Sequence, residues 1–332
     1  MDAFLRKIGC FLPVMLLLLL FSCTTMTGQK AFTPDRHLAY RVEADGTLPT
    51  KFAPVFVIEN DAAPYNRIGT PSAELTSGGK EHIFVDPEKA TVYARQAKFK
   101  TEGGSYTNLI YRVHFEKVPS GIFPFHLGKG NNVGVLVVVT LNEQHEPVLF
   151  TTVHTCGCYL AFIPTSFTPA ETLPDGWQTR GQSIHSENLP GWLDYGNQGL
   201  EEVKVVITIR DGSHRVKGIE LVRKDALENF RIKDAFLQPM DALENLPLEN
   251  RETTSFYEAS GPRRGYVKGS HKTRERIFMS WWALDWRIGE DKKLGESSND
   301  GIVFYTSLKP WRRESSDLRD FPGFLEFWKW KL

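Results

Sequence analysis

Residues 132–164, NVGVLVVVTLNEQHEPVLFTTVHTCGCYLAFIP, are the most apolar stretch of the chain after its N-terminus. Val133 to Leu141 is almost wholly apolar and rich in β-branched residues, which is typical of a strand buried on both faces. The polar residues 142–146 and Pro147 interrupt the run, and Val148 to Ala161 continues it. We therefore expect an antiparallel hairpin at the centre of a β-sheet.

Shorter patterns on both sides of this hairpin predict further strands. A first strand is expected over Phe52–Glu59. Between Thr107 and Val118 apolar and polar residues alternate, which predicts a half-buried strand with a polar outer face that includes Arg112 and His114. The segments 203–209 and 214–222 predict a second hairpin, because Asp211-Gly212 between them suits a tight turn.

Helical patterns are concentrated in the last third of the chain. The pentapeptide Asp-Ala-Leu-Glu-Asn at 225–229 and 241–245 predicts two helix starts, since Asp is a good N-cap. Residues 273–288 predict a helix with one apolar face and Gly289 as C-cap, 301–308 a strand, and 318–332 an aromatic helical face. The expected fold class is α+β, with a mainly antiparallel sheet, a central apolar hairpin and helices in the C-terminal third.

The N-terminus has the pattern of an export signal. Arg6 and Lys7 precede an apolar run over residues 11–21, which is shorter than the roughly 20 residues that a membrane span needs. The run ends in Leu-Phe-Ser-Cys at 20–23, which resembles the lipobox of bacterial lipoproteins. The resemblance implies cleavage before Cys23 and attachment of lipid, palmitate included, to that residue. Because Thr24 rather than Asp follows, it also implies sorting to the outer membrane of a Gram-negative cell, facing the periplasm.

Composition limits the partners and the organisation of the chain. Lys plus Arg and Asp plus Glu number 40 each, and a neutral chain carries no electrostatic footprint for nucleic acid. The expected parts are a signal peptide at 1–22, a tether at 23–50, a β-rich core at 51–249, and an aromatic-rich α+β part at 250–332 packed on the same core. Only four Cys occur, and two lie in the signal or at its end, which excludes a disulfide framework.

Three residues of the apolar stretch carry the most distinctive chemistry. On one continuous strand His154, Cys156 and Cys158 would share a face, and thiolates with an imidazole are ligands that zinc or copper prefers. Alternate residues on a flat strand lie about 6.7 Å apart, too far for two sulfurs to share an ion or a bond. Gly157 is the residue that could bend the strand and bring them together.

Three interpretations of this trio remain open. In the first, the thiols are buried small hydrophobes and His154 bonds the backbone. In the second, the trio binds zinc or copper with a remote ligand such as His114 or His126. In the third, Cys156 and Cys158 are a redox pair. An exported thiol pair meets oxidants, and the tight disulfide ring that it closes would be easily reduced. The motifs of zinc proteases, haem attachment, nucleotide-binding loops and hydrolase elbows do not occur in the sequence, so no catalytic residue is assigned.

Two late aromatic clusters have two interpretations each. One comprises Trp281, Trp282, Trp286 and Arg287, and the other is the run Trp-Lys-Trp-Lys at 328–331. Either cluster could lie at a lipid headgroup surface, but packing on the sheet is favoured because Asp285 and Glu326 interrupt the faces.

The sequence therefore predicts a lipid-anchored protein of the cell envelope. Its role is left between soft-metal binding, thiol–disulfide redox chemistry that includes an enzyme using the cysteine pair, and structural docking on other envelope proteins.

Overall fold

A ten-stranded mixed β-sheet organises the part of the chain that the computed structural model describes, residues 37–120, 127–296 and 301–332. These residues belong to one compact unit, Pro34–Leu332. The expected signal peptide and lipobox lie outside the described residues, and so does His126. Within the described ranges, no helix has the length and apolar character that crossing a membrane requires.

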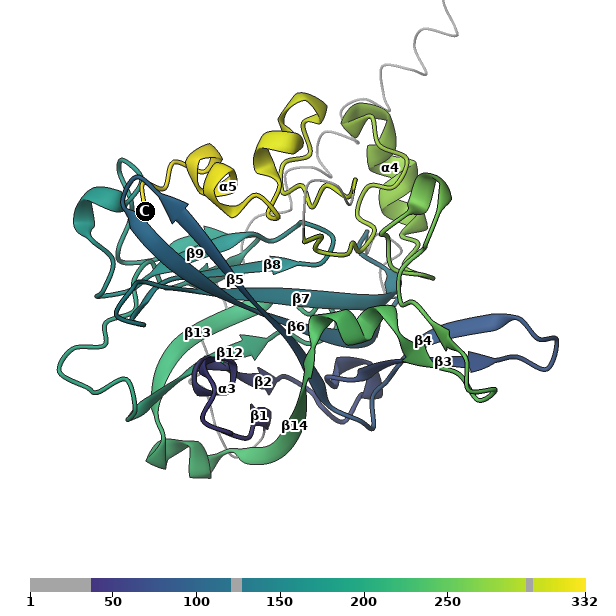
Figure 1. The fold of residues 1–332 in the computed structure, drawn as a ribbon, viewed down its shortest axis with the longest axis horizontal. Coiled ribbons are helices and arrows are strands. Elements are labelled where there is room, and N and C mark those ends of the chain that lie inside the picture. The colour runs from purple at the N-terminus through teal and green to yellow at the C-terminus, as the bar shows by residue number, and fades with distance from the viewer. Residues whose placement is uncertain (1–36, 121–126, 297–300) are drawn as a thin grey trace, which may run out of the picture. The chain divides into compact units, whose positions relative to one another are not determined.

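The strands of the sheet lie in the order β13-β12-β2-β1-β14-β5-β6-β7-β8-β9 (Figure 1). Six of the nine pairings are antiparallel, and β1 with β14, β12 with β2 and β14 with β5 are parallel. The bounds are β1 Leu38–Val42, β2 Val55–Ile58, β5 Thr91–Thr101, β6 Gly104–Val118, β7 Gly130–Leu141, β8 Pro147–His154, β9 Ala161–Pro164, β12 Val203–Ile209, β13 Val216–Arg223 and β14 Arg231–Pro239.

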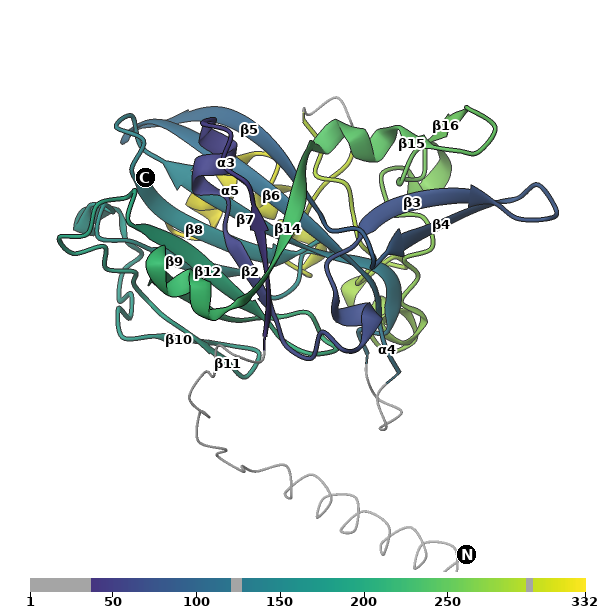
Figure 2. The same cartoon turned by 90° about the horizontal axis from the view of Figure 1, so that it is seen from below.

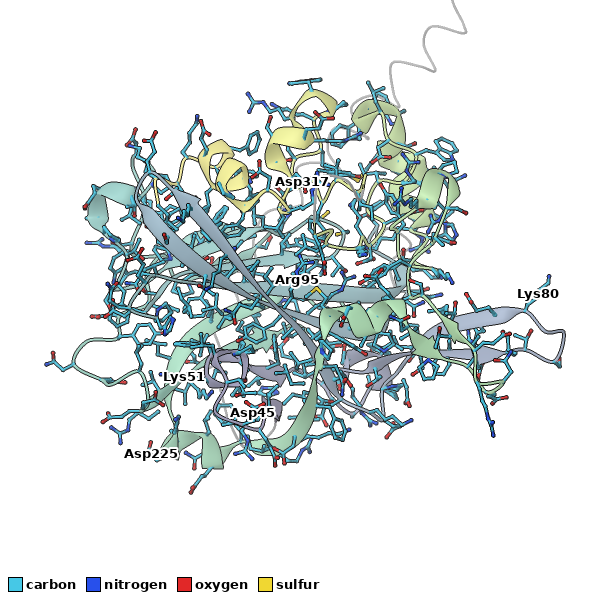
Figure 3. The ribbon with its side chains drawn as sticks, viewed as in Figure 1. Asp45, Lys51, Lys80, Arg95, Asp225 and Asp317 are labelled. Carbon is cyan, nitrogen blue, oxygen red and sulfur yellow. The ribbon has the colours of Figure 1, made fainter. Side chains whose placement is uncertain are left out.

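Shorter elements flank this sheet. The β3–β4 hairpin projects from it, with Lys80 in its turn (Figure 3). These elements are β3 Thr70–Leu75, β4 Glu81–Asp86, β10 Gln182–Ile184, β11 Glu187–Leu189, β15 Leu246–Pro247, β16 Thr253–Thr254, the α-helices α3 Leu48–Phe52, α4 Thr273–Ala283 and α5 Phe321–Phe327, and the 3₁₀ helices η2 Pro64–Asn66, η3 Ala170–Thr172, η4 Asp225–Asn229, η5 Met240–Glu244, η6 Gly261–Arg263, η8 Pro310–Arg312 and η9 Glu314–Ser316.

The central hairpin is confirmed, but its second strand is shorter than expected. β7 and β8 pair antiparallel, with Val135 opposite His154. The continuous strand predicted over 148–161 is wrong, because β8 ends at His154 and the chain turns back to pair β9 against β8. The hairpin of β12 and β13 is confirmed.

The sheet curls, and each of its faces is covered by a separate core. One buried cluster joins Ile207 of β12 to Phe150 of β8 and Ile163 of β9, so strands from opposite ends of the sheet enclose it. The second cluster lies on the other face, where the segment after β14 packs on β5–β9 through Phe256, Phe304 and other apolar residues (Figure 2). Both faces of β7 and β8 are therefore buried, as their composition predicts.

Burial of the second face corrects the expected polar side of β6. Arg112 and His114 were expected to face outward, but both have 0% exposure because the C-terminal segment covers them. Nε of Arg112 donates to Nε2 of His114 at 2.9 Å, and its Nη1 donates to the carbonyl of Lys292 at 2.9 Å. Polar residues on this strand thus attach the covering segment to the sheet.

Two further expectations need correction, one for the expected tether and one for the repeated pentapeptide. Within the expected tether at 23–50, residues 38–42 form β1 between β2 and β14, and residues 48–52 form α3. The helix starts expected at 225 and 241 are the short 3₁₀ helices η4 and η5, and β14 runs between them.

The C-terminal third differs more from expectation. The helix predicted over 273–288 ends at Ala283, because Leu284 adopts a left-handed conformation with φ 50°. Its predicted core face points outward, since Ile277 and Trp281 are 64% and 73% exposed. The strand expected over 301–308 is reduced to one bridge at Tyr305. The described residues are mainly β, with helices mostly in the C-terminal region, and the expected fold class is confirmed in this coarser form.

The two aromatic clusters differ in burial: Trp281, Trp282 and Trp286 are exposed, whereas the last segment packs into the second core. α5 buries Phe321, Phe324 and Leu325, which confirms the aromatic face predicted for the last segment. Trp330 is 3% exposed and packs against Phe162 and Trp177.

Replacing Trp330 by Ala is expected to lower the free energy of unfolding by about 3–5 kcal/mol, since the large ring leaves a cavity in the second core. Trp281→Ala, the matched change at an exposed ring, is expected to stay within about 0.5 kcal/mol of the parent. Denaturant unfolding of both variants measures the difference, and equal losses would contradict this assignment of buried and exposed rings.

Candidate functional site

The two free thiols lie in a tight turn immediately after β8. The amide of Gly157 donates to the carbonyl of His154 at 2.7 Å, and the amide of His154 donates to the carbonyl of Cys158 at 2.9 Å. Cys156 is 3% exposed, whereas Cys158 is half-buried. The turn replaces the flat strand on which the sulfurs would have been too far apart.

Gly157 is required by this turn for two reasons. Its φ is +90°, a conformation that side chains with a Cβ rarely adopt. A Cβ at this position would also lie 2.1 Å from the carbonyl oxygen of Tyr305. The prediction that Gly157 bends the chain is borne out, but the bend is a turn closed by the C-terminal segment.

A side-chain hydrogen bond between Cys156 and Cys158 makes the two thiols chemically unequal. The hydrogen bond from the Cys158 thiol is the largest influence on Cys156 and lowers its pKa well below the usual range. Burial of Cys156 opposes this change, while Lys272 and His154 lower the pKa further. The same hydrogen bond, followed by burial, raises the pKa of Cys158 well above its usual value. The pKa values of the two thiols are therefore shifted in opposite directions, and Cys156 is the more acidic of the pair.

His154 is oriented by the neighbouring hairpin. Its Nε2 lies 2.9 Å from the backbone carbonyl of His214, so this nitrogen carries the proton and donates. The ring packs edge-on against Tyr159, at 4.7 Å between centroids. The backbone bond expected for His154 in the simplest interpretation is present, and the imidazole also lies near the sulfur of Cys156.

A buried ion pair supplies positive charge beside the thiols. Nζ of Lys272 lies 3.3 Å from a carboxylate oxygen of Asp291, and the side chains are 4% and 1% exposed. The hydroxyl of Thr155, the residue before Cys156, donates to the other oxygen of Asp291. Burial opposes the charge of Lys272, but Asp291 and Cys156 raise its pKa well above the usual value. Lys272 is therefore a fixed cation next to the acidic thiol of Cys156.

Lys292 completes the contact between the turn and the C-terminal segment. Its amide donates to the carbonyl of Thr155 at 2.8 Å, and its Nζ donates to the carbonyl of Cys156 at 2.5 Å. The same ammonium lies 4.1 Å from the ring centroid of Tyr305. Burial lowers the pKa of Lys292. Lys292 thus holds the backbone carbonyls of both Thr155 and Cys156.

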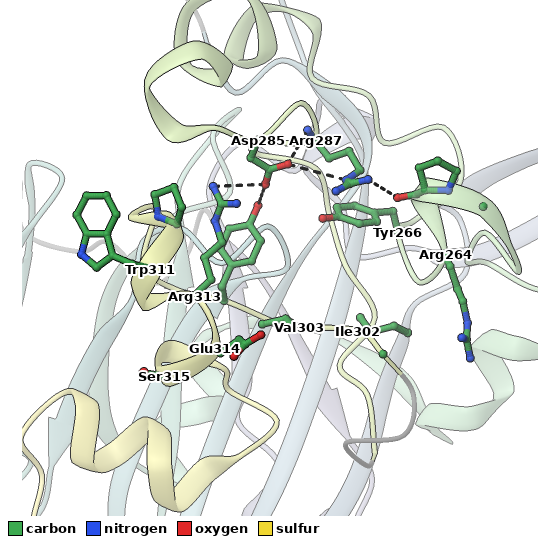
Figure 4. Close-up of a pocket in the computed structure, with 15 residues that line it drawn as sticks. Arg264, Tyr266, Asp285, Arg287, Ile302, Val303, Trp311, Arg313, Glu314 and Ser315 are labelled. Atoms are coloured by element: carbon green, nitrogen blue, oxygen red, sulfur yellow. Dashed lines mark hydrogen bonds and ion pairs between the residues drawn. The ribbon is translucent and has the colours of Figure 1, made fainter.

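A polar cavity of about 720 Å³ lies in the same C-terminal segment but is not lined by the thiols (Figure 4). Asp285 is its central charge: it accepts from the hydroxyl of Tyr305 and pairs at 3.9 Å with Arg287 and with Arg313. One carboxylate therefore faces two guanidiniums, and these three side chains carry a net positive charge. Tyr305 is the link to the thiol turn, because its carbonyl meets Gly157.

The metal interpretation stays a prediction. Among the described residues, no group of three or more His, Cys, Asp and Glu side chains is arranged to hold a metal ion. Of the two proposed remote ligands, His126 is outside the described ranges. His114 accepts a hydrogen bond from Arg112, and burial lowers its pKa well below the usual value.

Comparisons with protein-family models, with curated proteins and with solved structures find no match to this chain. The chemistry of the thiol turn is therefore inferred from its own residues.

Three residues of the site, Lys272, Asp291 and Lys292, were not predicted from the sequence. They lie more than a hundred positions after the cysteines, and a run such as Glu-Asp-Lys at 290–292 has the composition of an exposed loop. The one signal that could have indicated such a contact was indirect, because a glycine inside a strand can also mark the close approach of another backbone.

Changing Cys158 tests the origin of the low pKa of Cys156. Cys158→Ala removes the hydrogen-bond donor and is expected to raise the pKa of Cys156 toward the ordinary thiol value of about 8.5. Cys158→Ser keeps a donor and is expected to leave the pKa low. Thiolate absorbance against pH, corrected with the Cys156→Ser variant, measures it. The same titration for the Ala and Ser variants would show that the hydrogen bond is not the cause.

Proposed function

We propose that the protein is a thiol–disulfide redox protein whose reactive pair is Cys156 and Cys158. The feature that supports this best is the hydrogen bond between two free cysteines whose pKa values are shifted in opposite directions, downward at Cys156 and upward at Cys158. Inert buried cysteines have raised pKa values, whereas a pair used in exchange needs one sulfur that readily accepts negative charge.

The exposure of the two residues suggests the direction of attack. In the oxidised form, a thiolate of a partner dithiol attacks Sγ of Cys158, which belongs to the half-buried residue of the pair. A partner–Cys158 disulfide forms, the Cys156–Cys158 bond breaks, and Cys156 leaves as a thiolate. A leaving thiol of low pKa departs faster, so the stabilised Cys156 favours this step.

The second step completes the exchange. The partner's other thiolate attacks its own disulfide-bonded sulfur, which closes the partner disulfide and releases Cys158. Cys158 takes up a proton because its pKa is raised, and the partner's second proton goes to solvent. The partner loses two electrons and the protein gains two.

The same features favour electron acceptance. A ring closed across the single residue Gly157 is strained, and a stabilised thiolate lowers the free energy of the reduced form. Both effects raise the reduction potential, so the disulfide form is proposed to oxidise partner thiols.

Reaction of the reduced chain with dithiobis(nitrobenzoate), an aromatic disulfide, tests the pair. In the parent the first sulfur to react is expected to be displaced by the second, so two nitrothiophenolates are released and none stays bound. Cys156→Ser is expected to keep one label on Cys158. Cys158→Ser is expected to react about tenfold more slowly because Cys156 is buried.

The double variant Cys156→Ser/Cys158→Ser, measured in the same chain, subtracts the signal of Cys10 and Cys23. A parent that keeps label on both sulfurs would rule out the redox pair.

We also propose that this chemistry takes place at the cell envelope, on a chain anchored by lipid at Cys23. The support is the lipobox-like sequence at 20–23, and an oxidising compartment suits a disulfide exchange site.

Mass spectrometry of the mature N-terminal peptide is expected to find acylated Cys23, and Cys23→Ser is expected to move the protein out of the membrane fraction. Cys10→Ser, inside the signal, is the matched control and should change neither result. An unmodified Cys23 thiol in the mature protein would remove the anchor.

A further inference from the structure

Large apolar side chains are exposed in one region of the C-terminal segment. Seven of the nine exposed large hydrophobic residues of the described chain lie on α4, in the four residues after it, or at Trp311. Their exposed fractions are Ile277 64%, Phe278 51%, Trp281 73%, Trp282 46%, Leu284 71%, Trp286 65% and Trp311 76%. We call these seven residues the aromatic surface. α4 itself lies among the C-terminal elements that cover one face of the sheet (Figure 1).

Trp311, which is far from α4 in the sequence, lies in a segment that is bonded to the end of α4. The guanidinium of Arg313 donates to the carbonyl of Ala283, the last residue of α4, and pairs with Asp285. Trp311 and Asp285 line the same cavity (Figure 4). The residues around Trp311 are therefore held next to the end of α4.

The segments that carry the aromatic surface are rich in basic residues. Residues 273–287 and 309–313 contain six basic and two acidic residues. The acidic residues turn inward: a carboxylate oxygen of Glu275 occupies the space that a side chain at Gly289 would need, and Asp285 is 6% exposed and bonded to Tyr305. Lys309 and Arg312 are exposed, and Arg276 lies 4.3 Å over the ring of Trp286.

We propose that the aromatic surface lies on an anionic phospholipid membrane. Tryptophan suits the boundary between headgroups and acyl chains because its ring is apolar and its N–H is polar. Arginine side chains beside the rings reach the phosphates, and each basic residue near an anionic surface strengthens binding. A helix of this kind lies in the plane of the interface and does not cross it.

Charge favours lipid over the other occupants. A second copy of the chain would bring the same six basic residues face to face with their equivalents, which is repulsive. A peptide would need a groove, and the cavity beside Trp311 takes none of its walls from Ile277, Phe278 or Trp281. The surface contains neither Cys23 nor the thiol pair, so the inference stands or falls separately from the proposed redox function and its anchor.

Hydrogen–deuterium exchange on the full chain tests the inference. Vesicles of phosphatidylglycerol and phosphatidylcholine in equal parts are expected to slow exchange in peptides that cover 273–287 and 309–313. Trp281→Gln/Trp282→Gln is expected to abolish the slowing, because both rings are exposed and the change removes apolar contact without disturbing the core. Arg276→Gln is expected to weaken binding about fivefold.

Phe236→Gln is the matched control, because this ring on β14 is 68% exposed and lies outside the aromatic surface. Circular dichroism checks that each variant is folded. The inference is overturned by any of four results: no slowing with the anionic vesicles, equal slowing with phosphatidylcholine alone, slowing that survives in the double Trp variant, or slowing produced without vesicles by a higher protein concentration or by an unfolded reduced polypeptide.

Discussion

Burial of three consecutive charged residues, Glu290, Asp291 and Lys292, holds the C-terminal segment on the sheet. They are 2%, 0% and 1% exposed. Charges removed from water are costly unless each is paired and hydrogen bonded. Here Glu290 pairs with Arg263, Asp291 with Lys272 and the Thr155 hydroxyl, and Lys292 with backbone carbonyls. The pairs with Arg263 and Lys272 lie within the C-terminal segment, and the bonds to Thr155 and Cys156 join that segment to the end of β8.

The acidity of the thiols depends on the same constraint. Lys272 is fixed as a cation because Asp291 lies beside it, and Asp291 is placed by Thr155 at the end of β8. Lys292 binds the carbonyl of Cys156 and thereby holds the turn in which the sulfurs meet. A segment that stabilises the fold with charge thus also provides the electrostatic field at Cys156. A displacement of the segment or of the turn would therefore change both the packing on the sheet and the charge around Cys156.

Local patterns in the sequence predicted those elements whose environment is set by near neighbours. Apolar β-branched runs predicted β7 and β8, and Asp211-Gly212 predicted the β12–β13 hairpin, because pairing partners lie within a few residues. The alternation of β6 was also visible, but the burial of Arg112 was not. Arg112 is covered by the segment around Lys292, whose carbonyl accepts its hydrogen bond. In a sequence, an arginine on a strand gives the same pattern whether its hydrogen bonds go to water or to a distant carbonyl.

The candidate site divides in the same way. Two cysteines around a glycine were enough to locate it, since thiols are rare in this chain and Gly157 predicted a bend. The cations that tune the thiols could not be found, because a charged residue normally indicates solvent. For α4 the helical period was predicted correctly, but the orientation of its apolar face was not. Periodicity shows that Ile277 and Trp281 share a face, but not whether that face meets the core.

α4 connects the thiol turn with the aromatic surface. Lys272 precedes its first turn and Glu275 lies within it, both directed toward the thiols, while the rings of Phe278 and Trp281 point outward. Burial raises the pKa of Glu275 to about 7, so its charge depends on how well water reaches the inner side of the helix. The inner side of α4 and the residue before it thus hold charge next to the thiols, while the large apolar side chains of the helix are exposed. The core position that an apolar face usually takes is occupied here by charged groups.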